Sequence, residues 1–259
     1  MTTNAKLKRR IRNRDFVVGG WVSFSDPGIA ETFAMSGFDF IAIDLEHTTM
    51  TLAEAKAIIT ACHAAGVECL PRPVSHNNDF MKPLLEAGAD GLLFPMVESL
   101  VDVEKLVESF YYTPIGQRSY GVNRAHHYGL QFNRYIESWN DNGIFIPQIE
   151  SIKGVENIDE IIAHPMVDAV MVGPYDLSGS LGVPGDTNCE IVRDACSEII
   201  EACRRVGKGC CTQIQNPTSK NIQDALHAGY TFTFLGSDLF ILSEWAKSTL
   251  EIVEGLKND

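Results

Sequence analysis

Gly-Ile-Phe-Ile-Pro-Gln-Ile-Glu, at residues 143–150, is a short apolar run that ends in polar side chains. Side chains alternate between the two faces of a β-strand, so Ile146, Gln148 and Glu150 share one face. That face is apolar along the strand and becomes polar only where the strand ends. Residues 39–47 (DFIAIDLEH) repeat this design. Both stretches predict strands that are covered on both faces and carry polar chemistry at their ends.

The same kind of run recurs along the whole chain and alternates with longer stretches of helical spacing. We expect strands over 16–22, 39–45, 67–72, 91–95, 143–149, 168–172, 208–212 and 231–235. Helices are expected over 27–36, 51–65, 78–87, 99–110, 151–162, 188–206, 218–228 and 238–255. Strands that are each followed by a helix match an α/β fold of the (β/α)8 TIM-barrel type, which takes about 250 residues. An open doubly wound sheet is the alternative, but no G-x-G-x-x-G motif follows the first strand.

The chain shows no change of composition that would mark a linker, so residues 1–259 are expected to form a single barrel domain. Residues 1–15 are expected to form a basic N-terminal helix or arm in which Leu7 and Ile11 face inward. Residues 111–142 are expected to form a long irregular segment, and such segments in compact domains are often part of the active site. No internal repeat is evident.

The charge balance excludes one class of partner. Acidic residues outnumber basic ones by 34 to 21, which gives a formal net charge of −13 and leaves no basic face for nucleic acid. No apolar run approaches the ~18–20 residues of a membrane span. The N-terminal residues lack the apolar core of a signal peptide, so we expect a cytoplasmic protein. The seven cysteines contain no C-x-x-C pair, which fits buried thiols in a reducing compartment.

In such a barrel the chemistry lies where the strands end, so the residues at those ends are the candidates. The second strand ends in Asp44 and His47, and a strand-end histidine oriented by a nearby carboxylate can act as a general base. The third ends in Arg72, whose planar fork can hold a carboxylate or an enolate oxygen. Glu46 supports a competing interpretation, because a salt bridge from Arg72 to Glu46 would be purely structural.

Glu150 and Asp176, which follow the fifth and sixth strands, are the natural metal pair. Two carboxylates with waters suit a hard six-coordinate divalent ion such as Mg²⁺ or Mn²⁺, with Co²⁺ also possible. Zinc is disfavoured because no Cys/His cluster has ligand spacing. A Schiff-base mechanism is disfavoured as well, because Lys208 lies at the start of a strand rather than at its end.

Together these residues resemble the HpcH/HpaI aldolase family of metal-dependent pyruvate aldolases. The resemblance runs from about residue 16 to residue 255, in order and in spacing. The motifs that carry it are Trp21, Asp44-x-Glu46-His47, Arg72-Pro73, Pro95-Met96-Val97, Gln148-x-Glu150 and Gly173-Pro174-Tyr175-Asp176-Leu177-Ser178. Each motif alone is common, whereas the joint pattern is specific.

The resemblance implies roles for particular residues of this chain. His47, assisted by Asp44, would be the base, and Arg72 would stabilise the pyruvate enolate. Glu150 and Asp176 would hold the divalent metal ion. The residues implied in substrate binding are Arg72, Gln148, Tyr175, Asp176 and Trp21.

The resemblance also implies an assembly. The last helix would be exchanged with a neighbouring subunit, within a homohexamer built from dimers. Glu86 matches an acidic position that approaches the base. Relatives carry an Arg-Gly pair after the fourth helix, whereas Arg118 is followed here by Ser119. That segment borders the aldehyde pocket in relatives, so the acceptor aldehyde stays open.

The functional hypothesis is a metal-dependent aldolase, a carbon–carbon lyase. It would reversibly cleave a 4-hydroxy-2-oxo acid of the 2-keto-3-deoxy type to pyruvate and an aldehyde through a metal-stabilised enolate. Two alternatives stay open. One is a citrate-lyase-β-like lyase acting on acyl-CoA thioesters, which predicts a basic nucleotide-binding surface. The other is an inactive barrel that serves as a binding subunit.

Overall fold

The computed structural model describes residues 3–258, and its centre is a ring of parallel strands. The strands are β1 (Val17–Val22), β2 (Phe40–Asp44), β3 (Glu68–Arg72), β4 (Gly91–Phe94), β5 (Ile144–Ile149), β6 (Ala169–Val172), β7 (Gly209–Ile214) and β8 (Phe232–Leu235). Their order in the sheet is β3-β2-β1-β8-β7-β6-β5-β4. The ring closes where β3 meets β4, with the Asp90 N–H donating to the Cys69 carbonyl at 3.0 Å.

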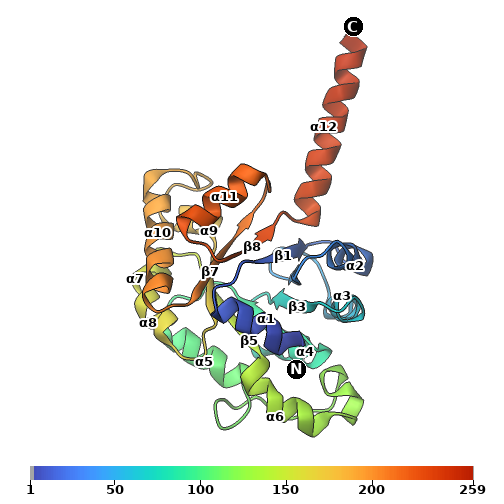
Figure 1. Cartoon of the computed structure of the whole chain (residues 1–259), viewed down its shortest axis with the longest axis vertical. Coiled ribbons are helices and arrows are strands. Elements are labelled where there is room, and N and C mark those ends of the chain that lie inside the picture. The colour runs from blue at the N-terminus through green and yellow to red at the C-terminus, as the bar shows by residue number, and fades with distance from the viewer. Residues whose placement is uncertain (1–2, 259) are drawn as a thin grey trace.

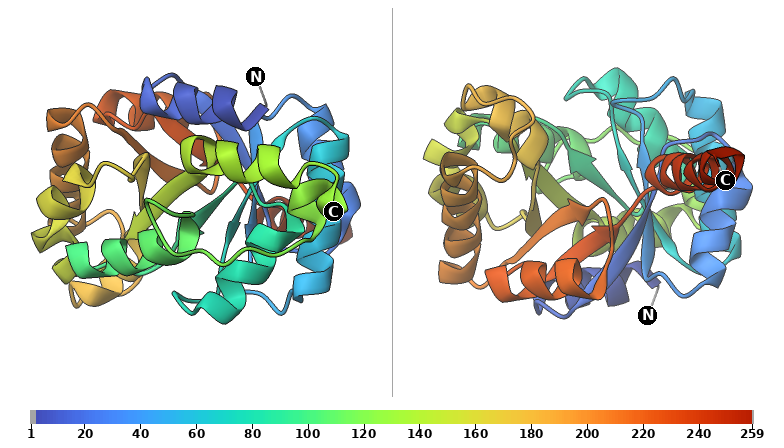
Figure 2. Two further views of the ribbon diagram at one scale, coloured as in Figure 1. Left: turned by 90° about the horizontal axis from the view of Figure 1, so that it is seen from below. Right: turned by 90° about the horizontal axis from the view of Figure 1, so that it is seen from above.

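Helices surround this ring, as Figure 2 shows from both ends. They are α2 (Pro27–Met35), α3 (Leu52–Ala64), α4 (Asn78–Ala87), α5 (Leu100–Phe110), α7 (Ile152–Glu156), α8 (Ile158–Ala163), α9 (Pro174–Ser180), α10 (Glu190–Arg205) and α11 (Ser219–Ala228). The expected (β/α)8 TIM-barrel fold is therefore confirmed. We call the end where strands begin the foot of the barrel and the end where they finish the rim.

The two faces of each strand enter different cores, as the alternation in the sequence predicts. Ile41 and Ile43 of β2 pack between the strands and the helices, whereas Ala42 points into the barrel. In β5, Ile144 and Ile146 likewise lie inside the barrel. Apolar side chains thus fill the barrel interior below the rim, and the polar groups of the same face are left at the rim.

Helix α1 (Thr3–Arg12) packs against the foot. Leu7 and Ile11 are buried among the interior side chains, as expected. Lys8 is buried as well, and its ammonium donates to the Gly143 carbonyl at 2.6 Å and pairs with Asp168 at 3.4 Å. The basic N-terminal segment thus covers the foot of the barrel, where two of its charges, Lys8 and Arg12, pair with the buried carboxylate of Asp168.

A clasp at the foot recurs four times around the barrel. The residue just before each even-numbered strand donates its N–H to a residue of the preceding odd strand and accepts that residue's N–H with its side chain. The clasp residues are Asp39, Asp90, Asp168 and Thr231. This periodicity is a structural repeat of two β/α units, which no repeat in the amino-acid sequence indicates.

The segment 111–142 is more regular than expected. After an extended stretch it forms the 3-10 helix η1 (Arg124–Gly129) and then helix α6 (Phe132–Asn142). The expectation of one irregular segment is therefore wrong over α6. Its apolar residues, Tyr135, Ile136 and Trp139, have helical spacing and pack on the main core, so the helical signal was present in the sequence.

Helix α12 (Asp238–Asn258) is the last element and extends away from the barrel (Figure 1). Asp238 anchors its beginning, because that carboxylate accepts the N–H groups of Ser23 and Phe24 after β1. Beyond the anchor, large apolar side chains are exposed, among them Leu242, Trp245, Ile252 and Leu256. No helix of residues 3–258 is both long enough and apolar enough to cross a membrane.

Candidate active site

An ion pair between the ends of β2 and β3 forms the base of the site. Asp44 and Arg72 are register partners in the sheet, so their side chains start from neighbouring backbone positions. The Arg72 Nε donates to Asp44 Oδ1 at 3.0 Å, and Nη2 donates to Oδ2 at 2.8 Å. Both side chains are buried, and a bidentate pair of this kind fixes the plane of the guanidinium.

The remaining face of Arg72 is also restrained. Its Nη1 lies 3.4 Å from Gln148 Oε1 and 3.1 Å from Glu46 Oε2. The guanidinium lies over the ring of Trp21, 4.8 Å from the ring centroid. Trp21 was expected to bind substrate, but with 3% of its surface exposed it supports Arg72 from below.

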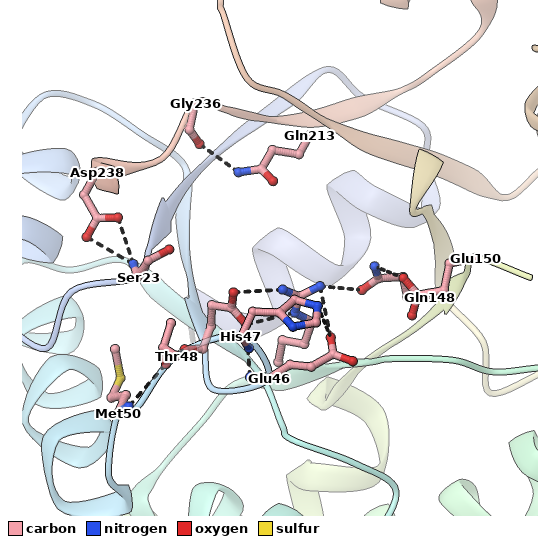
Figure 3. A network of polar contacts seen from close by, with 12 residues as sticks. Ser23, Glu46, His47, Thr48, Met50, Gln148, Glu150, Gln213, Gly236 and Asp238 are labelled. Atoms are coloured by element: carbon pink, nitrogen blue, oxygen red, sulfur yellow. Dashed lines mark hydrogen bonds and ion pairs between the residues drawn. The ribbon is translucent and has the colours of Figure 1, made fainter. Parts of the chain in front are cut away.

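Gln148 and Glu150, on the face of β5 predicted to end in polar groups, continue the network (Figure 3). The Gln148 amide donates to Glu150 Oε2, and the Met96 N–H donates to Glu150 Oε1 at 2.7 Å. Gly173, which follows β6, makes room for this carboxylate. A Cβ at Gly173 would lie 2.5 Å from Glu150 Oε2, closer than atoms can approach.

Carboxylates accumulate around this point. Burial raises the pKa of Glu150 to about 8, and the nearby charges of Glu46 and Asp176 act in the same direction. Burial also raises the pKa of Glu46. Arg72 opposes both shifts, but its charge is already shared with Asp44. The protein alone therefore leaves an excess of negative charge at the rim.

This donor set fits a hard divalent cation. Glu46 Oε2 is buried and accepts no hydrogen bond, although Arg72 Nη1 lies 3.1 Å from it, so one carboxylate oxygen of the cluster is left without a donor. Residues 3–258 contain no convergent group of three or more His, Cys, Asp or Glu side chains. The protein would thus supply Glu150 and Asp176 as oxygen ligands and leave the other positions to water or substrate.

His47 lies at the open side of the rim, with 59% of its side chain exposed. Asp44 contacts it through the main chain, because Asp44 Oδ1 accepts the His47 N–H at 3.3 Å. The carboxylate nearest to the imidazole belongs to Glu46, whose Oε2 lies 3.7 Å from His47 Nε2. Asp44 therefore fixes the backbone of the 44–47 turn, and Glu46 contacts the ring.

Asp176 and Tyr175 stand in the first turn of α9, beside β6. Both are exposed, and the Tyr175 hydroxyl donates to Gln215 Oε1 at 3.4 Å. The charge of Asp176 contributes to the raised pKa of Glu150. Because β5 and β6 are paired with Ile149 opposite Val172, Glu150 and Asp176 follow neighbouring strands at the same edge of the rim.

Glu86 lies elsewhere. It lies in the last turn of α4, at the foot, where it pairs with Arg118 at 3.2 Å and lies 3.7 Å from His126 Nδ1. Arg118 is enclosed by aromatic rings, with Tyr112 and Trp139 at 4.7 and 4.9 Å from its guanidinium carbon. Within one chain, Glu86 is therefore at the opposite end of the barrel from His47.

Two contributions to the site were missed from the sequence, the backbone N–H of Met96 and the missing side chain of Gly173. The motifs Pro95-Met96-Val97 and Gly173-Pro174 did mark their positions. A pattern of side-chain types does not show what a backbone donor or an absent Cβ does, since both depend on how strands approach one another.

Comparisons with known proteins identify relatives over nearly the whole chain. The family model described as HpcH/HpaI aldolase/citrate lyase matches residues 18–244. The chain is 31% identical to a 2-keto-3-deoxy-L-rhamnonate aldolase of Salmonella dublin, over 97% of this chain and 94% of the relative. It is 32% identical to a hydroxypyruvate/pyruvate aldolase of Roseovarius nubinhibens, over 94% and 95%. A crystal structure of a HpcH/HpaI aldolase/citrate lyase family protein from Burkholderia cenocepacia superposes with a TM-score of 0.90, at 28% identity, covering 96% of this chain and 99% of that chain.

Fold, rim and relatives together define a carbon–carbon lyase of the aldolase class. The chain belongs to the HpcH/HpaI aldolase/citrate lyase family, whose model covers the barrel from β1 into α12.

Proposed function

We propose that this aldolase binds a divalent metal ion on Glu150 and Asp176 and cleaves a 4-hydroxy-2-oxo acid to pyruvate and an aldehyde. The observation that carries the proposal is the continuous network from Asp44 through Arg72 and Gln148 to Glu150. This network connects the fixed guanidinium of Arg72 to the buried carboxylate of Glu150, and it spans the ends of β2, β3 and β5. Mg²⁺ and Mn²⁺ suit the all-oxygen donors best, and Co²⁺ is a further candidate. A bound divalent ion would supply Lewis-acid stabilisation of negative charge on the 2-oxo acid.

Arg72 holds the oxyanion that develops when the carbon–carbon bond breaks. Because Asp44 and Trp21 fix its plane before substrate arrives, little reorganisation is needed at the moment of reaction. The Gln148 amide lies between Arg72 and Glu150 and orients the bound 2-oxo acid.

His47 moves the proton of the C4 hydroxyl, directly or through a water. Its exposed ring lies beside Glu46 (Figure 3), on the open side of the rim where the aldehyde portion would lie. Positioned general-base groups contribute about 10²–10⁴-fold to a rate. The nearest carboxylate to this ring is that of Glu46, whose Oε2 lies 3.7 Å from His47 Nε2.

Two further features of the family are proposals for this chain. The exposed apolar face of α12 supports exchange of that helix between subunits, in a dimer-based oligomer such as a hexamer. Glu86 could act beside a base only across a subunit contact, because it lies at the foot of its own barrel. All seven cysteines are free thiols, which supports a reducing compartment such as the cytoplasm.

The test follows pyruvate in D₂O with Mg²⁺ or Mn²⁺ by proton NMR. Enolate formation exchanges the methyl protons of pyruvate, so the wild type should lose the methyl signal. Arg72→Lys should slow exchange by about 10²-fold, since the bidentate fork is lost. Glu150→Gln should abolish the metal-dependent exchange.

His227→Asn, at an exposed site on α11, is the control for His47→Asn and should behave as wild type. Exchange in the Glu150→Gln variant at the wild-type rate would refute the assignment.

A further inference from the structure

A cavity of about 500 Å³ opens at the foot of the barrel, at the opposite end from the rim. It lies between the end of α3, the residues that precede β3 and β4, the helix η1 and the helix α6. Gly66 and Gly88 mark the two strand starts. The catalytic network uses none of the lining residues, so the cavity is separate from the site described above.

The cavity is lined by an excess of positive charge in a chain of net charge −13. Arg124 and Arg134 line it together with His63 and His127, and Asp90 is the one acidic residue among the lining side chains. That acid is already engaged. Asp90 Oδ2 accepts the Cys69 N–H at 2.8 Å and lies 2.8 Å from His63 Nε2.

Arg124 is held in place by the same network. Both of its terminal nitrogens lie 3.1 Å from His63 Nδ1, and Nη1 also donates to the Ala87 carbonyl at 2.9 Å. Arg124 can only donate, so Nδ1 accepts and the histidine proton lies on Nε2, toward Asp90. The chain Asp90–His63–Arg124 thus presents a preorganised guanidinium to the cavity.

Arg134 on α6 is the second arginine that lines the cavity. Within residues 3–258 its guanidinium has no ion pair or hydrogen bond. The lining side chain of His127 is likewise without a partner in this part of the chain. One arginine that is fixed and one that is free thus line the same cavity, and two guanidinium forks of this kind can hold an anion.

The backbone at the edge of the cavity is strained. His127 and Tyr128 have φ of 48° and 55°, and Gly129 follows at 97°, so three consecutive residues are left-handed. Such a conformation costs energy for residues with a side chain. It places the His127 imidazole and the exposed Tyr128 ring against the cavity, where Tyr135 supplies a second aromatic surface.

We propose that this foot cavity binds a small organic anion, a carboxylate or phosphate carried on a planar apolar body. The anionic group would lie between Arg124 and Arg134, and the body would pack on the rings of Tyr128 and Tyr135. The inference does not depend on the substrate of the aldolase, because it concerns residues at the other end of the barrel.

Calorimetric titration of the full-length protein tests this. Phenyl phosphate and benzoate are the two probes, which separate the phosphate from the carboxylate form of the ligand. Arg134→Gln should weaken binding of the better probe at least about tenfold, because a charge-assisted contact is lost. This variant should fold normally, since the arginine is exposed and unpaired. Arg9→Gln, on an exposed α1 side chain outside the cavity, should leave binding unchanged.

Neutral benzamide and inorganic phosphate complete the design, since each has only one half of the proposed chemistry. Both should bind more weakly than the probe that combines the two. Equal affinity in the wild type and Arg134→Gln would overturn the proposal, as would benzamide binding as tightly as benzoate. Absence of binding by both probes would overturn it too.

Discussion

Arg72 shows how single residues at the rim are matched to one another. A buried arginine paired with a buried aspartate adds little net stability, because desolvation of both charges offsets their attraction. The pair instead fixes the orientation of the Arg72 guanidinium. Two hydrogen bonds to Asp44 and the packing on the Trp21 ring allow it only one orientation. Positioning accounts for the arrangement better than stability does.

Gly173 supplies a prediction at this scale. In Gly173→Ala the new Cβ would lie 2.5 Å from Glu150 Oε2 and 2.8 Å from Glu150 Cβ, so the carboxylate has to move. The φ of Gly173 is −105°, so alanine meets no backbone strain and the effect is steric. We expect Mn²⁺ affinity, measured by calorimetry, to fall at least about tenfold, with kcat falling in parallel.

Gly179 in α9 is the matched control, because a Cβ there has nothing within 4 Å. Gly179→Ala should keep metal affinity and raise stability slightly, by up to about 1 kcal/mol, since alanine favours helix. If both variants bound Mn²⁺ equally well, Glu150 would not be a metal ligand.

At the scale of elements, strands were the most predictable part. Each of the expected runs became a strand, with ends that shifted by at most a residue or two, because a strand buried on both faces must be apolar throughout. The stretch 151–162 divided into α7 and α8, which meet at Asn157. Helix α6 was missed because charged and amide residues dominate its exposed side and hide a narrow apolar stripe.

Contacts between elements were less accessible from the sequence. The clasp at the foot joins residues about 21–23 positions apart, and one of its four members is a threonine in place of aspartate. The burial of Lys8 depends on Asp168, 160 positions along the chain. At the rim, residue types and strand ends could be predicted, whereas the partners of Asp44 required the register of β2 and β3.

Glu68, at the start of β3, makes the packing of α1 and β3 sensitive to pH. Its side chain is buried, and burial together with the charge of Asp90 raises its pKa from 4.5 to about 7. The folded chain therefore holds this proton more tightly than the unfolded chain. The resulting stabilisation is complete below about pH 4.5 and is lost as the pH rises through about 7, by up to about 3 kcal/mol.

Glu68→Gln should remove that part of the pH dependence. Urea unfolding at several pH values between 4.5 and 7.5 gives the free energy of unfolding of both proteins. The difference between variant and wild type isolates Glu68, because the other buried carboxyl groups contribute equally to both. The variant should become relatively more stable as the pH rises. Glu160→Gln, at an exposed position on α8, should follow the wild-type curve. A Glu68→Gln curve parallel to wild type would show that Glu68 titrates normally in the folded chain.

At the scale of the whole molecule, α12 is the element that a single chain leaves without a partner. Leu242, Trp245, Ile252 and Leu256 recur at helical spacing, and each is more than half exposed. A stripe of this kind on a helix that projects from its barrel marks a contact with another protein surface (Figure 1).

If that surface is another copy of this chain, a double change of Leu242→Glu and Ile252→Glu should convert the oligomer to smaller species in sedimentation velocity, because two charges would be buried. The barrel should keep its circular dichroism, since these side chains make no part of its core. Lys247→Glu, on the opposite side of the same helix, should sediment as wild type. An unchanged oligomer in the double variant would place the subunit contact elsewhere.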